Sequence, residues 1–195
     1  MLSSIHPLGE RSRNNNWGIT VVAFTVGSVT AGSAVGATLG WLGSTLVSRA
    51  PETALLVATA VVALLSGILD LARKRPPGPR RQVNETWIGA FRGWVYGGGF
   101  GLELGAGLAT YVVTWSVYAM FVGEMLTSSV MAGAMVGAVF GFGRSLSLMT
   151  AVHVDRPSRL TAFNRKLATA GPVVRRSGAT LLVAAGAVVF AVGIG

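Results

Sequence analysis

Residues 94–118 read WVYGGGFGLELGAGLATYVVTWSVY, and this stretch decides the expected fold. It is apolar, it exceeds the ~20 residues that a helix needs to cross a bilayer, and it carries one acidic residue, Glu103. Small residues recur at every fourth position, so they line one side of a helix and let a second helix approach closely. That row contains Gly93, Gly97, Gly101, Gly105 and Ala109. The stretch therefore predicts the interior helix of a membrane bundle.

The composition also points to a membrane protein. The chain has 195 residues, of which 51% are hydrophobic and 12% charged, and its mean hydropathy is +0.60. A soluble domain carries about twice that charged fraction. We expect an all-α polytopic transmembrane helix bundle of about five spans, with six as the alternative count.

Uninterrupted apolar windows place these spans. Residues 1–16 are polar and predict a cytoplasmic tail, and the first span is expected to act as an uncleaved insertion signal. The rest, 17–195, is expected to form a single transmembrane domain with basic cytoplasmic loops at 72–92 and 144–178. The predicted spans are 17–46, 54–71, 94–122, 129–142 and 179–194.

Two other predicted spans carry similar rows of small residues, one from Ser28 to Ser44 and one from Ser129 to Ser145. Small residues at this spacing normally mediate helix contact, and a glycine-lined ion route is the alternative. The predicted packing residues are Gly32, Gly36, Gly40, Gly97, Gly101, Gly105, Gly133, Gly137 and Gly141.

The distribution of cations predicts the orientation. With the N-terminus inside, 15 of the 16 basic residues are cytoplasmic, and Arg49 alone is outside. We therefore expect a multi-pass protein of the bacterial inner membrane, with its C-terminus outside if there are five spans. The net charge of +9 then reflects loops that meet anionic lipid rather than a nucleic-acid interface.

A weak internal repeat of about 70 residues is visible. Trp17 and Trp87 each precede a glycine-row stretch, and both units would start on the cytoplasmic side. Spacing alone supports a parallel duplication, because glycine-rich helices resemble one another for packing reasons.

Glu103 is the first candidate for a functional site. It lies nine residues beyond Trp94, or about 14 Å along a helix, near the centre of the hydrocarbon core. A carboxylate at that depth is costly unless it is protonated, paired or facing a wet cavity. One reading is a proton or cation site; the other is a protonated group that serves assembly. The expected lining residues are Tyr96, Thr110, Tyr111 and Thr114.

The remaining polar residues have simpler expected roles. Asp70 is expected to pair locally with Arg73 and Lys74 at a helix end. Glu124 is expected to be solvated in an outer turn. Arg92 and Arg144 are expected to extend to the membrane interface.

No catalytic chemistry is expected. The chain has no cysteine, so thiolate metal sites and disulfides are excluded, and its two histidines form no ligand constellation. GGGFGLELG looks like a dinucleotide fingerprint but lies within an apolar span rather than after a strand. We expect no cofactor, no metal site and no enzymatic activity.

The run RQVNETWIGAFRGWVYGGGFGLELGAGLATYVVTWSVYAMFVGEML, with GAVFGFGR after it, carries a family resemblance over about 82–144. It resembles small glycine-rich polytopic bacterial membrane proteins that are loosely grouped with the cytochrome-c-biogenesis and small-exporter superfamily. Redox members of that superfamily depend on paired membrane cysteines, which are absent here. The resemblance thus implies a membrane bundle but transfers no site residue.

Two functional hypotheses remain open at this point. The first is a transporter- or permease-like protein that moves a small solute or ion with Glu103 as its intramembrane site. The second is a non-catalytic subunit or scaffold, in a homo-oligomer or a larger membrane complex.

Overall fold

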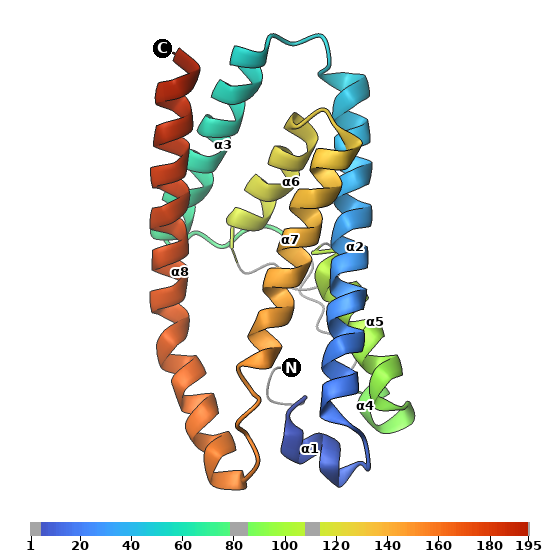
Figure 1. Cartoon of the computed structure of the whole chain (residues 1–195). Helices are drawn as coiled ribbons and strands as arrows, with labels where there is room; N and C mark the ends of the chain where they lie inside the picture. Colours follow the sequence, from blue (N-terminus) through green and yellow to red (C-terminus); the bar gives the residue numbers. More distant parts are fainter. Residues whose placement is uncertain (1–4, 79–85, 108–113, 195) are drawn as a thin grey trace.

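The computed structural model describes residues 5–78, 86–107 and 114–194, and every regular element in these ranges is a helix. The elements are drawn in Figure 1 and follow in chain order: α1 (Pro7–Ser12), α2 (Trp17–Leu46), α3 (Glu52–Leu71), α4 (Trp87–Ala90), α5 (Gly93–Gly105), α6 (Ser116–Leu126), α7 (Val130–Met149) and α8 (Pro157–Ile194).

The central element is α2, a helix of 30 residues and about 45 Å. The Asn16 side chain caps its start by accepting the Gly18 N–H at 2.9 Å. Helix α7 lies along α2, α5 packs near its beginning, and α6 contacts it further along (Figure 1). The glycine rows of α2, α5 and α7 are buried at these contacts.

The predicted continuous span at 94–122 is wrong, because the stretch contains two separate helices. Helix α5 ends at Gly105, and Gly107 has φ +68°, a left-handed conformation that glycine adopts readily at a helix end. Helix α6 begins at Ser116 and packs against α3 as well as α2 (Figure 1). At 13 and 11 residues, neither helix is long enough to cross a bilayer.

A second helical pair consists of α3 and the C-terminal half of α8. Close approach needs glycine here: a Cβ on Gly67 would lie 2.9 Å from the Ala179 carbonyl oxygen, and one on Gly186 would lie 3.1 Å from that of Ala60. The segment 144–178, expected as a basic loop, is helical up to Met149 and again from Pro157, where α8 begins.

Four described helices are long and apolar enough to cross a membrane, namely α2, α3, α7 and α8. The molecule thus fits a multi-pass helical membrane protein. The described chain has four such helices, one fewer than the five predicted spans. Trp87 begins the four-residue α4 and not a long helix. The proposed internal repeat stays a prediction.

Candidate functional site

Three acidic side chains are buried where helices meet, and they are the most unusual polar groups of the described chain. Glu10 is 0%, Asp70 3% and Glu124 0% exposed. Acidic side chains are rarely buried to this degree unless they are paired. Two of the three have hydrogen-bond partners, and the third, Glu124, has none in the described part of the chain.

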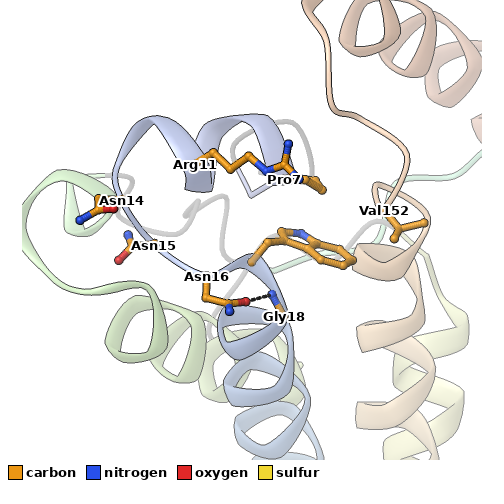
Figure 2. Close-up of a pocket in the computed structure, with 8 residues that line it drawn as sticks. Pro7, Arg11, Asn14, Asn15, Asn16, Gly18 and Val152 are labelled. Atoms are coloured by element: carbon orange, nitrogen blue, oxygen red, sulfur yellow. Dashed lines mark hydrogen bonds between the residues drawn. The ribbon is translucent and has the colours of Figure 1, made fainter.

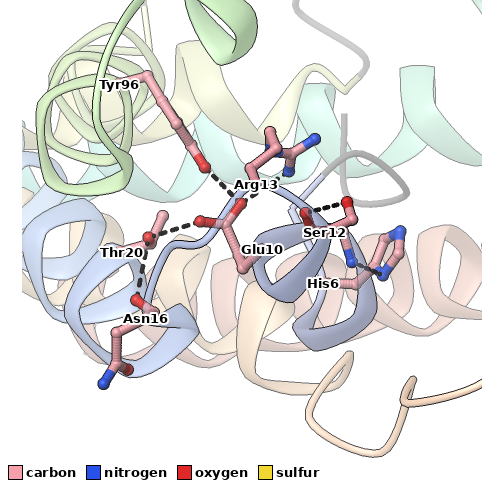
Figure 3. A network of polar contacts seen from close by, with 8 residues as sticks. His6, Glu10, Ser12, Arg13, Asn16, Thr20 and Tyr96 are labelled. Carbon is pink, nitrogen blue, oxygen red and sulfur yellow. Dashed lines mark hydrogen bonds and ion pairs between the residues drawn. The ribbon is translucent and has the colours of Figure 1, made fainter.

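Glu10 joins α1 to α2 and α5 (Figure 3). Its Oε1 accepts hydrogen bonds from the Tyr96 hydroxyl and, at 2.8 Å, from the Arg13 guanidinium. Its Oε2 accepts the Thr20 hydroxyl at 2.9 Å. Gly93 leaves room for this carboxylate, because a Cβ there would lie 3.0 Å from Oε2. The expected cytoplasmic tail is therefore partly a packed helix.

The start of α1 is also fixed by polar contacts. His6 caps the helix, with Nδ1 accepting the Gly9 N–H at 3.0 Å, and the Leu8 N–H donates to the Val154 carbonyl at 3.2 Å. Burial lowers the pKa of His6, and the charge of Arg13 acts in the same direction. Burial acts to lower the pKa of Arg13. The hydrogen bond from Arg13 to Glu10 acts in the opposite direction, and the resulting guanidinium pKa lies above its ordinary value.

A polar hollow of about 620 Å³ borders α1 and the start of α2 (Figure 2). Arg11 lies on one side and Val152, just after α7, on another. Its remaining lining residues are Pro7, Asn14, Asn15, Asn16, Trp17 and Gly18.

Asp70 connects α3 to the start of α6. Its Oδ1 accepts the Trp115 N–H at 2.9 Å, and its Oδ2 accepts the N–H and hydroxyl of Ser116, each at 3.2 Å. These N–H groups have no partner inside the helix, and the helix dipole favours a negative charge there. The expected side-chain pairing of Asp70 with Arg73 and Lys74 is replaced by this tertiary cap.

The segment after α3 is fastened to α6 by two further bonds. The Trp115 indole N–H donates to the Lys74 carbonyl at 3.0 Å, and the Tyr118 hydroxyl donates to the Pro77 carbonyl. Asp70 and this segment together determine where α6 begins.

Glu124 sits in a niche between α2 and α7. Its Oε1 lies 3.2 Å from the position that a Cβ would take on Gly36 and 3.2 Å from the equivalent position on Gly137. Neither carboxyl oxygen has a hydrogen-bond partner within the described chain. The expectation of a solvated Glu124 is wrong, because the last turn of α6 points this side chain into the bundle.

The niche exists because glycine rows of α2 and α7 face each other. A Cβ on Gly36 would clash with the Gly133 carbonyl oxygen, and the reverse substitution would clash equally. The pair Gly32 and Gly137 repeats this reciprocal contact one turn away. Backbones at this distance exchange weak Cα–H···O contacts, and no larger residue fits.

The residues expected around Glu103 do not gather at it. Glu103 is half-buried on α5 and makes no hydrogen bond or ion pair within the described chain. Tyr96 donates to Glu10 instead, and Thr114 lines a hollow beside α8. Thr110 and Tyr111 lie outside the described residues.

The two arginines expected at the interface differ in surroundings. The Arg144 guanidinium lies over the Phe140 ring, 5.2 Å from its centroid. Arg92 precedes α5 and lines a hollow of about 380 Å³ together with Arg13.

No protein-family model and no solved structure match the chain. Among curated proteins, it is 31% identical over 153 residues to the methylamine utilization protein MauF of Methylophilus methylotrophus, covering 74% of this chain and 52% of that protein. MauF of Methylorubrum extorquens is 31% identical over 145 residues, covering 73% and 49%. MauF of Paracoccus denitrificans is 37% identical over 97 residues, covering 49% and 35%. The match spans about half the length of the first two relatives and about a third of the Paracoccus one, and over that part the chain is similar to proteins named for methylamine utilization.

Proposed function

We propose that the chain is a non-catalytic membrane component of an amine-utilization system. The observation that carries this proposal is the similarity to MauF proteins, which covers about three quarters of the chain in two cases. Such a component serves other proteins of the system from the membrane, in a larger complex, and needs no reaction centre of its own.

The use of the buried polar groups supports this proposal. Glu10 holds α1 against α2 and α5, and Asp70 holds the start of α6 against α3. Both carboxylates are engaged in joining helices, which is what a structural component requires.

We also propose a location in the inner membrane with the N-terminus in the cytoplasm. The base of α2, α1 and the basic half of α8 lie at one end of the molecule, whereas the end of α8 lies at the other (Figure 1). The cations of the first end include Arg11, Arg13 and Arg159, and cytoplasmic placement of such residues follows the positive-inside rule.

One observation favours a second candidate function, the handling of a proton or a small cation within the membrane. Glu124 is wholly buried and has no hydrogen-bond partner among the residues that the structure describes, and intramembrane acids of this kind often mark ion pathways. This reading moves the permease-like hypothesis from Glu103 to Glu124. The lining residues expected for a site at Glu103 do not carry over to Glu124, since the Tyr96 hydroxyl donates its hydrogen bond to Glu10.

Gene deletion in the organism that encodes the chain tests the main proposal. The deletion strain should fail to grow with methylamine as sole nitrogen and carbon source and should grow normally on an unrelated carbon source with ammonium. The wild-type gene supplied in trans should restore growth. Unchanged growth on methylamine would refute the assignment to amine utilization.

A further inference from the structure

We propose that the N-terminal half of α8, together with the turn after α7, forms a groove that binds an acidic amphipathic helix of a partner protein. This inference rests on the proposed function, because it names the kind of partner that the membrane component would hold.

The groove-facing stripe of α8 has the spacing of a helix-packing surface. Its apolar members follow one another at intervals of four, three and four residues, as in a helix that packs along a second helix. They are Phe163, Leu167, Ala170 and Val174, each of which lines at least one of two hollows. Leu167 is 36% and Val174 67% exposed and Ala170 is exposed too, whereas Phe163 is half-buried, so the described chain leaves three of these four side chains exposed.

Two adjoining hollows follow this stripe. One, of about 520 Å³, lies between α8 and the turn after α7, where His153 and Val154 face Phe163. The other, of about 620 Å³, lies between α8 and Arg73. Leu167 and Ala170 line both, so the two hollows adjoin each other along α8 and together make up the proposed groove. A groove with an apolar floor is what an amphipathic helix requires.

The rims of the groove are cationic. Arg159 and Lys166 border the first hollow, and Arg73 and Arg175 border the second. Asp155 is the only acidic residue after Glu124, and it pairs with Arg159 at 3.1 Å. Charge complementarity therefore favours an occupant with acidic flanks.

A second copy of this chain does not fit the groove, since symmetric pairing would set these cations against each other. The chain also has no acidic segment of its own, because its seven acidic residues are dispersed and Glu10, Asp70 and Glu124 are buried. These 195 residues therefore supply no occupant, and the proposed one is a helix of another protein.

A lipid surface is a poorer occupant than a protein helix. A surface-bound amphipathic helix lies in the plane of the membrane. Here α8 runs from Pro157 to Ile194 with Pro172 inside it, and it bends between its two halves, but its basic half still extends away from its apolar half (Figure 1). Leu160 lies fifteen residues, or about 22 Å, beyond Arg175 along the helix.

The test uses the full chain in nanodiscs of zwitterionic phosphatidylcholine. The probe is a fluorescent 21-residue peptide with leucine at the first and fourth positions of each heptad and glutamate on its flanks. A matched peptide carries lysine instead of glutamate. The glutamate peptide should bind at least about tenfold more tightly than the lysine peptide, as measured by fluorescence anisotropy.

Two variants locate the site. Lys166→Glu should weaken binding about tenfold, whereas Arg165→Glu, with the same charge change on a neighbouring residue that lines neither hollow, should weaken it less than about twofold. Leu167→Ser should weaken binding to a similar extent as Lys166→Glu. Equal effects of the two charge reversals, or no binding of the glutamate peptide, would overturn the proposal.

Anionic lipid is the competing outcome. Hydrogen exchange over 157–178 would be compared in discs with and without phosphatidylglycerol. Strong protection by the anionic lipid without peptide binding would assign the groove to lipid and overturn the proposal. Failure of this test leaves the growth phenotype of the deletion strain unaffected, so the two proposals can fail separately.

Discussion

The Asp70 carboxylate accepts the backbone N–H and the hydroxyl of Ser116, each at 3.2 Å, although the two residues are 46 positions apart in the chain. Through this contact, the end of α3 determines where α6 starts. A helix of eleven residues is marginal by itself, and it depends on such tertiary contacts.

Replacing Asp70 should therefore loosen α6. Asp70→Ala removes the cap and leaves the Trp115 N–H without its partner, which should cost about 1–2 kcal/mol of unfolding free energy. Denaturant unfolding in detergent measures this loss of unfolding free energy. Glu52→Ala, at an exposed carboxylate on the same helix, is the control and should change little. Equal stability of Asp70→Ala and the wild type would rule out the cap.

The Glu10 network should be sensitive to a single hydroxyl. Tyr96→Phe removes a donor to a wholly buried carboxylate and should cost about 1.5–3 kcal/mol, as hydrogen bonds to charged groups do. Tyr118→Phe, which loses an exposed bond to the Pro77 carbonyl, should cost less than about 1 kcal/mol. The thermal midpoint of Tyr96→Phe should therefore lie below that of Tyr118→Phe. A lower midpoint for Tyr118→Phe would contradict the claim.

Glycines of α7 provide a matched pair of substitutions. Gly137→Ala places a methyl group against the Gly32 carbonyl oxygen and should destabilise the α2–α7 contact by about 1–3 kcal/mol. Gly143→Ala meets nothing within 4 Å and should be neutral or slightly stabilising. The thermal unfolding midpoints of the two purified variants measure this difference in stability. Similar destabilisation by both would mean that helix propensity, and not close packing, governs these positions.

His6 should make stability depend on pH. Its folded pKa is lowered, so below about 6.5 the unfolded chain binds a proton that the folded chain resists. Stability from this group is therefore present above about pH 6.5 and is lost as pH falls through the folded pKa. His6→Asn keeps a capping side chain that does not titrate, so the thermal midpoint should fall less between about pH 7.5 and 5.5 than in the wild type. An identical fall in both would show that His6 is not responsible.

The sequence predicted the helical class and the bounds of two helices well, because long apolar windows and four-residue glycine spacing have few other structural meanings, whereas α7 extends past the predicted 142 and α8 begins well before the predicted 179. Helix α2 occupies the predicted 17–46, and α3 differs from the predicted 54–71 only at its first turn. The break between α5 and α6 was missed, since an apolar sequence looks the same in one helix or in two. Gly107, two residues after Gly105, was the available signal for a helix end.

The buried carboxylates were missed for a different reason. The partners of Glu10 and Asp70 include Tyr96 and Ser116, which are 86 and 46 residues away in sequence, and local spacing does not predict such contacts. The sequence places Glu124 in an outer turn because it predicts one continuous span that ends at residue 122. Once α6 is a separate helix that ends at Leu126, Glu124 falls in its last turn and points inward.

Growth on methylamine with Glu124→Gln, normalised to the amount of protein in the membrane, tests the central claim most directly. Glutamine keeps the size of the side chain and cannot hold a negative charge. If the chain is a non-catalytic component, the variant should reach wild-type membrane abundance and support growth at the wild-type rate. Normal abundance with failed growth would contradict the account and assign Glu124 to proton or cation handling.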